Sequence, residues 1–280
     1  MNEILYVNKP KGITSFDLCF KLRKVLNTKR IGHCGTLDPN ATGVMIVLSG
    51  NTTKANQFLV SASKEYVAKV KLGIETDTLD ITGNIIKEDY SYMLNKNALI
   101  SVLNGFIGDS VQEPPITSAI KINGKKLYEY QRENKEVEIP LRNINISEME
   151  LLEYDKDSFT FRCACSSGTY IRSLVRDILK RMNLIGTLEE LTRTKIDDID
   201  INQCDSLEDV LIGNYRSHSL YDVLKSRYPM YQVDNVDDVL NGKKLHLDSS
   251  EDEVLLVNKE NVLAIYRKDG DIYRCVRGLF

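Results

Sequence analysis

The hydrophobic pattern of the chain predicts several β-strands. In KEYVAKVKLG (64–73), apolar and polar residues alternate with a period of two, which is typical of a half-buried strand. The predicted covered face of this strand holds Tyr66, Ala68, Val70 and Leu72. SFTFRCAC (158–165) alternates in the same way, while GVMIVLSG (43–50) is a continuous apolar run that indicates a buried strand. ILYVNK (4–9) is predicted to be a further short strand before a Pro/Gly turn.

Helical spacing of apolar residues predicts three helices. SFDLCFKLRKVLN (15–27) follows Thr14 or Ser15, either of which can cap a helix, and ALISVLNGFIG (98–108) is closed by glycine. In the first of these, the residues at helical spacing are Phe16, Cys19, Phe20 and Leu26. The segment 171–182 fits an amphipathic helix through Ile171, Leu174, Val175, Ile178, Leu179 and Met182. Its residues Arg172, Arg176 and Lys180 recur at four-residue steps and predict a separate basic ridge.

The pattern changes from about Arg227 onward. Several short strand-like segments follow, separated by Asn-Gly and Asp-Gly, the dipeptides that favour tight hairpins. We therefore predict an α/β (α+β) protein with a main domain over residues 1–226 and a small β-rich domain over 227–280.

Composition limits the class of protein. With 280 residues, 42% hydrophobic and 28% charged, the chain has room for one large domain and a small one. No apolar run is long enough for a membrane span and the N-terminal residues lack an apolar signal core, so we expect a cytoplasmic protein that makes no membrane contact. The sequence pattern indicates no subunit interface, so we expect a monomer by default.

Cysteine and histidine residues give no pattern of metal ligands. The six cysteines form no CxxC pair and the three histidines lie far apart, so we expect reduced thiols, no metal and no structural zinc. Cys163 and Cys165 would share one strand face, where packing explains them better than redox chemistry.

Charge is distributed unevenly along the chain. The formal net charge is −3, yet residues 1–40 hold seven Lys/Arg against three Asp/Glu, and residues 162–195 again hold seven against three. From 196 to 280 the balance reverses to ten against seventeen. The two basic segments indicate a local basic surface suited to nucleic acid, or two solvated helix faces.

Asp38 is the first candidate for chemistry. It lies in GHCGTLDPNATGVMIVLSG (32–50), between two Gly/Thr-rich turns and before the apolar run. Pro39 restricts Asp38 to extended geometry, which makes a helical role unfavourable. Asp side chains in such places often cap their own turn, and this stretch alone favours that interpretation over catalysis.

Arg172 changes that balance. It falls in the first turn of its predicted helix, where the positive end of the helix dipole disfavours a cation. An arginine beside a carboxylate keeps it ionised and oriented, as a nucleophile requires. The alternative is an ordinary surface arginine.

Tyr66 and a group of basic residues could contact nucleic acid. A core tyrosine is the default on an apolar strand face, but an aromatic ring facing a cleft can also stack on an unpaired base. The basic residues that flank the turns around the first helix, and could hold phosphates, are Lys9, Lys11, Lys29 and Arg30.

Five blocks in order resemble the TruB family of bacterial tRNA pseudouridine synthases. They are VNKPKGITS, IGHCGTLDPNATGV, KEYVAKVKLGIETDTLDITG, VQEPPITSAIKINGKKLYEYQRE and SSGTYIRSLVRD. Cys34 stands where the family commonly has threonine. The resemblance implies isomerisation of the TΨC-loop uridine, position 55 of tRNA, to pseudouridine, with the tRNA T-arm as partner and no cofactor or obligate protein partner.

The resemblance also implies roles for individual residues. Asp38 would be the catalytic aspartate, Tyr66 would stack on the flipped base and Arg172 would pair with Asp38. His33 would help the nucleotide to swing out and Leu191 would line the pocket. The further substrate contacts within matching blocks would be Lys9, Gly35, Thr36, Lys121 and Tyr170.

The implied architecture is the pseudouridine-synthase fold around a mixed, largely antiparallel sheet. Residues 116–140 would form the RNA-gripping thumb, in which Asn134 replaces a common glycine, and residues 227–280 would form a short PUA-like domain. The acidic stretch LDSSEDEV departs from a phosphate-binding surface, and IGTLEELTR lacks the Ala-His pair often found before Leu191.

Three alternatives are open at this point. A non-catalytic tRNA-binding or tRNA-folding module would not need a carboxylate facing the RNA, because that charge repels phosphate. A guide-RNA-dependent synthase subunit would carry a larger basic C-terminal region. A glycoside hydrolase normally uses two carboxylates, and Asp77 and Asp80 are more simply interpreted as loop residues than as a second acid.

Overall fold

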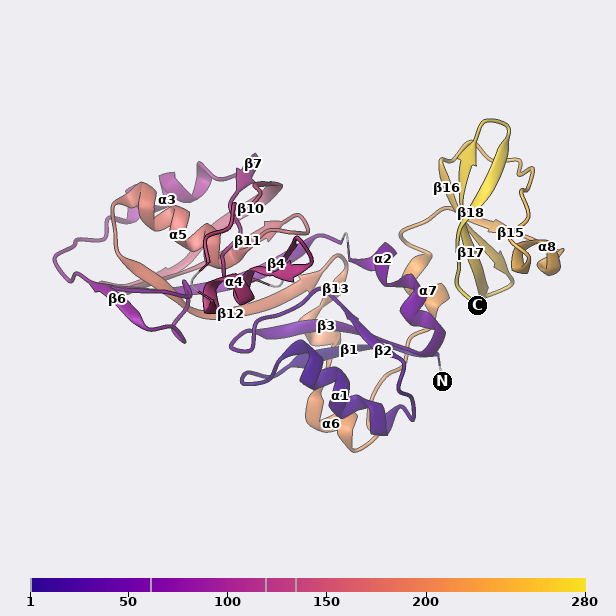
Figure 1. Cartoon of the computed structure of the whole chain (residues 1–280), viewed down its shortest axis with the longest axis horizontal. Helices are drawn as coiled ribbons and strands as arrows, with labels where there is room; N and C mark the ends of the chain where they lie inside the picture. Colours follow the sequence, from indigo (N-terminus) through magenta and orange to yellow (C-terminus); the bar gives the residue numbers. More distant parts are fainter. Residues whose placement is uncertain (1, 61, 119, 134) are drawn as a thin grey trace. The chain divides into compact units, whose positions relative to one another are not determined.

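The structure is a computed structural model that describes residues 2–60, 62–118, 120–133 and 135–280 (Figure 1). The chain forms two compact units. The first comprises Met1–Asp38, Met45–Val60 and Asn202–Phe280, and the second comprises Pro39–Val44 and Ser61–Ile201.

Three strands near the start of the chain and one much later strand form one end of the main sheet. They are β1 (Ile4–Lys9), β2 (Ile31–Cys34), β3 (Thr42–Ser49) and β14 (Asp205–Ser206). β1 lies between β14 and β3, and β2 pairs antiparallel with β3. The predicted apolar strand is confirmed, because every residue of β3 after Thr42 is buried.

Short helices accompany this sheet. They are α1 (Ser15–Val25), η1 (Gly50–Ala55), α2 (Asn56–Leu59), η2 (Ile201–Gln203), α6 (Leu207–Leu211) and α7 (Leu220–Leu224). α1 begins as predicted at Thr14: the Thr14 side chain accepts from the Asp17 N–H, and the Asp17 carboxylate accepts from the Thr14 N–H.

The predicted apolar face of α1 is wrong in part. Phe16 and Phe20 were expected to face the core with Cys19 and Leu26, but they are 64% and 62% exposed. Leu18, Leu22 and Leu26 recur every four residues and, with Cys19, make a fuller apolar stripe. Only one stripe of a surface helix can face the core, so the phenylalanines lie in solvent.

The C-terminal residues form a separate four-stranded sheet. Its order is β15 (Met230–Gln232), β16 (Glu253–Asn258), β17 (Asn261–Asp269) and β18 (Ile272–Gly278). This confirms the predicted small β-rich segment, and its core includes Leu256, Tyr266 and Tyr273. The domain boundary at 227 stays a prediction.

The two predicted C-terminal turns have different outcomes. The Asp-Gly dipeptide at 269–270 lies at a hairpin, as predicted: β17 ends at Asp269, and Gly270 and Asp271 join it to β18. Asn241 and Gly242 instead end a helix, α8 (Val236–Leu240), so the hairpin predicted there is wrong. Gly242 has a φ of +64°, and a left-handed glycine terminates a helix as readily as it makes a hairpin turn.

The second unit contains the longer part of the main sheet. Its strands are β4 (Lys64–Leu72), β7 (Gly108–Gln112), β10 (Arg142–Tyr154), β11 (Ser158–Cys165), β12 (Gly186–Ile196) and β13 (Ile199–Asp200). The order β12-β4-β11-β10-β7 is antiparallel throughout, and β12 also pairs in parallel with the first residues of β3. The predicted mixed, largely antiparallel sheet is therefore confirmed.

Two helices cover part of this sheet. α3 (Lys96–Asn104) packs against β10 and α5 (Ile171–Met182) packs against β12 (Figure 1). α5 matches its prediction, whereas α3 begins at Lys96 rather than Ala98 and ends at Asn104, before Gly105. Within the part of the chain that the structure describes, no helix combines the length and the hydropathy that a membrane crossing requires.

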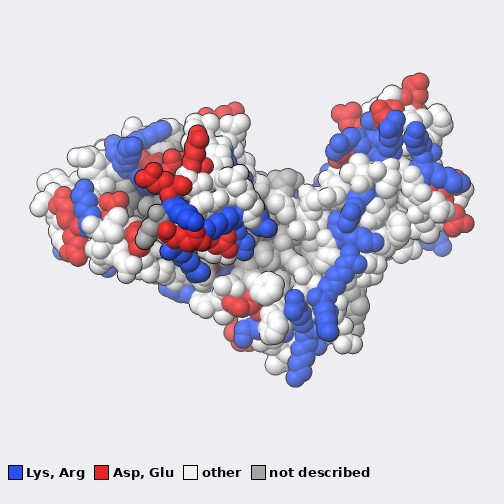
Figure 2. All heavy atoms as spheres, in the orientation of Figure 1, with Lys and Arg blue, Asp and Glu red and all other residues white. Residues whose placement is uncertain are grey.

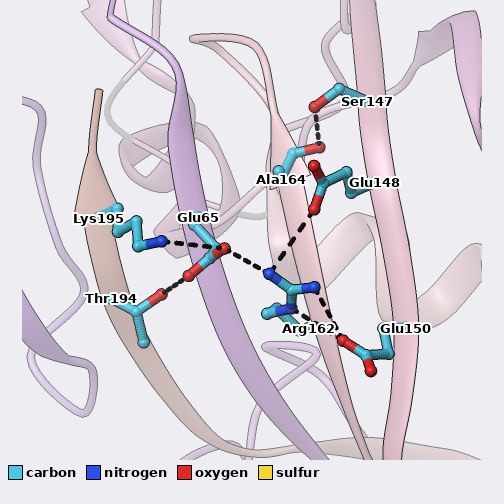
Figure 3. Close-up of polar contacts among 8 residues, drawn as sticks. All are labelled: Glu65, Ser147, Glu148, Glu150, Arg162, Ala164, Thr194 and Lys195. Carbon is cyan, nitrogen blue, oxygen red and sulfur yellow. Dashed lines mark hydrogen bonds and ion pairs between the residues drawn. The ribbon is translucent and has the colours of Figure 1, made fainter. Parts of the chain in front are cut away.

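The opposite sheet face carries a network of charged side chains (Figure 3). Arg162 on β11 contacts Glu65 at 3.0 Å, Glu150 at 2.8 Å and Glu148 at 3.6 Å, and Lys195 on β12 also contacts Glu65. Because successive strand residues point to opposite faces, Tyr66 points to the buried face of β4.

Two small hairpins complete the second unit. β5 (Ile74–Thr76) pairs with β6 (Ile85–Glu88), and β8 (Lys121–Ile122) pairs with β9 (Lys125–Lys126) before α4 (Leu127–Arg132). The second hairpin lies within the predicted thumb and turns at Asn123 and Gly124, which both have positive φ. Asn134, the predicted departure from the family thumb, lies outside the described residues.

Candidate active site

The first unit presents Asp38 on a fixed loop after β2. The Ser15 hydroxyl, at the first turn of α1, accepts from the Leu37 N–H at 2.9 Å and donates to the Leu37 carbonyl at 3.0 Å. Leu37 is buried, whereas Asp38 is half-buried. Because Ser15 clamps the preceding residue and Pro39 follows, the backbone of Asp38 has little freedom.

The same loop carries three further predicted residues. His33 is half-buried and pairs with Val47 in the β2–β3 ladder. Gly35 has a φ of +78°, a conformation that favours glycine, and Thr36 is exposed. The structure thus brings His33, Gly35, Thr36 and Asp38 together in one short segment.

Lys9 differs from its prediction. It is fully buried, and its ammonium donates to the carbonyls of Pro10 at 2.9 Å and Ile13 at 2.8 Å. A buried ammonium must satisfy its donors inside the protein, and here it braces the turn before α1. The expectation that Lys9 holds an RNA phosphate does not fit this burial.

Tyr66 lies in the middle of β4 and is only 7% exposed. In register it faces Cys163 on β11 and Arg193 on β12. Burial raises the pKa of Tyr66 above its ordinary value, while the charge of Arg193 and a hydrogen bond from it act in the opposite direction. The phenol is therefore protonated at neutral pH and can donate a proton.

Arg193 is a site residue that the sequence patterns did not single out. It is 1% exposed, and its Nε donates to the Val44 carbonyl at 2.8 Å. Its backbone pairs with Gly43, at the start of β3. The available signal was an arginine inside a strand that also holds buried apolar residues, because a buried guanidinium needs acceptors nearby.

Arg172 is the second residue of α5 and is 6% exposed. Its guanidinium donates to the Thr117 hydroxyl at 2.5 Å, the Thr117 carbonyl at 3.2 Å and the Thr78 carbonyl at 3.2 Å. These bonds tie α5 to the loop after β5 and to the start of the predicted thumb. Asp38 belongs to the first unit and Arg172 to the second, so the pairing of the two residues stays a prediction.

The predicted basic ridge on α5 is not a continuous surface feature. Arg172 is buried, and Arg176 contacts Asp177 at 2.9 Å and Glu113 at 3.5 Å. Lys180 is the exposed member of the series. Arg172 and Arg176 therefore serve mainly to join segments of the second unit.

The other predicted contacts are spread over the second unit. Leu191 pairs with Ala68 on β4 and shares a strand face with Arg193. Tyr170 precedes α5, and the Gln112 side chain bonds its N–H at 2.8 Å and its carbonyl at 3.1 Å. Lys121 is exposed on β8.

Known proteins identify the family. The model of the TruB family pseudouridylate synthase, N terminal domain, matches residues 23–171. The chain belongs to the TruB family. A tRNA pseudouridine synthase B of Mycoplasma capricolum subsp. capricolum is 39% identical over 98% of this chain and 96% of its own length. That of Oceanobacillus iheyensis is 40% identical over 95% of this chain and 93% of its own.

A solved structure has a similar fold. A chain in the crystal structure of a Cbf5-Nop10-Gar1 complex matches 99% of this TruB-family chain and 85% of its own length, with a TM-score of 0.74. Its sequence identity is 21%, so the likeness concerns the fold. Together with the family model, it confirms the predicted fold class.

Proposed function

We propose that this chain is a tRNA pseudouridine synthase that isomerises the TΨC-loop uridine at position 55. The observation that carries the proposal is the position of Asp38, which follows the residue that Ser15 clamps, Leu37, in the loop after β2 of a TruB-family chain. The relatives named tRNA pseudouridine synthase B align with nearly the whole chain. A binding module would have no need of this carboxylate, because it repels the RNA backbone.

The proposed reaction rearranges one nucleoside. The C1′–N1 bond breaks, the uracil rotates while it stays bound, and a C1′–C5 bond forms. C5 then loses its proton and N1 gains one, so no atom is added overall. Asp38 acts as the nucleophile or as the base that starts an elimination, since one carboxylate can serve either role.

Tyr66 and Arg172 complete the proposed catalytic set. The Tyr66 ring stacks on the flipped uracil, and its protonated phenol is suited to deliver a proton rather than to remove one. Arg172 keeps the Asp38 carboxylate ionised in this proposal. Leu191 lines the base pocket and His33 assists the movement of the nucleotide out of its stack.

Binding of the T-arm must supply the energy of base extrusion, which is of the order of a few kcal/mol. In the proposal this comes from the basic segments and from the hairpin that carries Lys121, whose side chain is exposed. We further propose that the enzyme acts in the cytoplasm as a monomer, without an obligate protein partner.

The product test uses an unmodified tRNA transcript. After incubation with the protein, pseudouridine should be found by nucleoside analysis and mapped by reverse transcription after carbodiimide treatment. We expect one new pseudouridine at position 55, and none in a transcript with cytidine at that position. Tight binding of the transcript without any pseudouridine would contradict the proposal and favour a tRNA-folding module.

A further inference from the structure

The solvent face of α1 carries an unusual group of side chains. Phe16 and Phe20, one helical turn apart, are 64% and 62% exposed. The guanidinium carbon of Arg23 lies 5.8 Å from the centre of the Phe16 ring and 5.4 Å from that of Phe20. We call Phe16, Phe20 and Arg23 the aromatic stripe. Grouped apolar side chains in solvent typically mark a binding surface.

Arg23 is held by rings rather than by a carboxylate. Its Nε is buried and has no hydrogen-bond acceptor among the residues that the structure describes. Asp17, the one carboxylate on α1, is used by the capping box with Thr14. The guanidinium plane is therefore available for cation–π contacts, which Arg makes more often than Lys.

Positive charge surrounds the aromatic stripe. Lys21 and Lys24 are exposed on α1, and Lys11 is exposed in the turn before it. Figure 2 shows Lys and Arg side chains gathered over the surface at α1 and η1, elements of the same unit. Exposed aromatic rings among exposed lysines match the chemistry of single-stranded RNA, whose bases stack while its phosphates attract cations.

The aromatic stripe begins at the loop of Asp38. Ser15, which clamps Leu37, immediately precedes Phe16. From Phe16 to Arg23 the helix rises about 10 Å at roughly 1.5 Å per residue. Since successive nucleotides are about 3.4 Å apart along a stacked strand, the stripe is as long as about three stacked bases.

We propose that the aromatic stripe stacks unpaired nucleobases of the RNA substrate that neighbour the target uridine. The inference rests on the proposed function and deepens it, because it adds an RNA contact outside the pocket for the reacting base. Phe16 and Phe20 hold the bases, Arg23 stacks on the outer base, and Lys21 and Lys24 hold the adjoining phosphates.

The first test removes both rings. A Phe16→Ala/Phe20→Ala variant should bind unmodified tRNA roughly five- to twentyfold more weakly, because stacking on an aromatic side chain contributes substantially to each base contact. KM should rise by a similar factor while kcat at saturating tRNA stays unchanged. The matched control is Tyr90→Ala, because Tyr90 is 65% exposed but follows Glu88 and Asp89.

The second test reports stacking directly. The chain contains no tryptophan, so Phe20→Trp introduces a single indole fluorophore on the aromatic stripe. Titration with tRNA should quench this fluorescence. The Kd obtained from the quenching should equal the Kd from a filter-binding assay. The control variant, Tyr90→Trp, should show no quenching. If Phe20→Trp binds tRNA poorly, Phe16→Trp is measured in its place.

The outcomes separate this inference from the proposed function. Absence of pseudouridine from the wild-type reaction would overturn the proposed function. Wild-type activity, with unchanged KM in the double alanine variant and no quenching in either tryptophan variant, would overturn the aromatic stripe alone. A variant that changes the oligomeric state but not tRNA affinity would assign the stripe to contacts between copies of the chain and would also overturn the inference.

Discussion

At the scale of single residues, Tyr66 and Arg193 form a buried polar pair on neighbouring strands. Tyr66 has a raised pKa because it is buried, and Arg193 is bound to the Val44 carbonyl by its Nε. The phenol is thus protonated across the neutral range while a fixed cation lies beside it. This arrangement suits a hydroxyl that takes part in proton transfer, and it also fixes the ring for stacking.

Tyr66→Phe tests the hydroxyl separately from the ring. We expect tRNA affinity to change little and kcat to fall by roughly a hundredfold or more, the usual contribution of a proton-transfer group. Single-turnover kinetics with saturating enzyme would measure the chemical step. Tyr66→Leu is the companion variant and should lose affinity as well. A fully active Phe variant would restrict Tyr66 to stacking and packing.

The sequence singles out the motif residues, whose roles stay predictions, but it does not show the environment of Arg193. Asp38, Tyr66 and Arg172 lie in segments whose residue types suggest chemistry even before the family is considered. Arg193 contacts Gly43 and Val44, which precede it in the sequence by about 150 residues. No local pattern encodes such a long-range strand pairing. Lys9 shows the reverse error, because a lysine at the end of a strand, next to a polar turn, gives no sign that it is buried.

At the scale of secondary-structure elements, the close approach of β3 to β12 depends on Gly43. Its φ is +108°, and a Cβ at this position would lie 2.2 Å from the Arg193 carbonyl oxygen and 2.8 Å from the Arg193 nitrogen. Both obstacles are backbone atoms, so rotation of a side chain cannot relieve the collision. Glycine is required here both by conformation and by space.

Gly43→Ala should therefore destabilise the protein more than a matched glycine substitution. Gly108 has nearly the same φ, +110°, and a methyl group added there would have no described atom within 4 Å. Gly108→Ala should cost about 1–2 kcal/mol of backbone strain. Gly43→Ala should lose a further ~1–3 kcal/mol or fail to fold, because the strands must separate. Urea unfolding measures both, and equal midpoints would contradict this account.

Hydrophobic periodicity predicted most elements and failed where two faces competed. β3, β4, β11 and α5 have one apolar pattern each, and the structure confirms them. α1 has apolar residues on two faces, and only tertiary packing decides that the leucines are buried and Phe16 and Phe20 exposed. The same limit applies to Asn241 and Gly242, whose backbone preference suits a helix end and a hairpin equally.

At the scale of the whole molecule, burial of tyrosines should determine stability at high pH. Burial raises the pKa of Tyr6 and of Tyr266 to about 12, and raises that of Tyr66. An unfolded tyrosine ionises near pH 10. Between pH 10 and 12 the unfolded chain therefore loses these protons while the folded chain keeps them, and the free energy of unfolding falls as pH rises.

Urea unfolding from pH 8 to 11 would measure this fall, and phenolate absorbance would follow the native titration. Tyr6→Phe should weaken the pH dependence, since the ring packed against His218 is kept and the ionisable group is lost. If all fourteen tyrosines of the native protein ionised near pH 10, this part of the account would be contradicted.

Charge and architecture were predictable at this scale only in part. The sequence shows two basic segments in a chain of net charge −3, and it correctly predicts a small C-terminal sheet after residue 227. It did not predict the two compact units, in which the N-terminal residues group with the C-terminal ones. That grouping depends on pairings such as β1 with β14, which join distant segments and leave no periodic signal.

The most direct test of the central claim is tritium release from tRNA transcribed with uridine labelled at C5. Formation of the C1′–C5 bond expels this hydrogen into water, so wild-type protein should release one equivalent from the T-loop uridine. Asp38→Asn should release none while it binds tRNA at least as tightly, because a charge that repels phosphate is removed. Wild-type rates of release from Asp38→Asn would contradict the assignment of Asp38 as the catalyst.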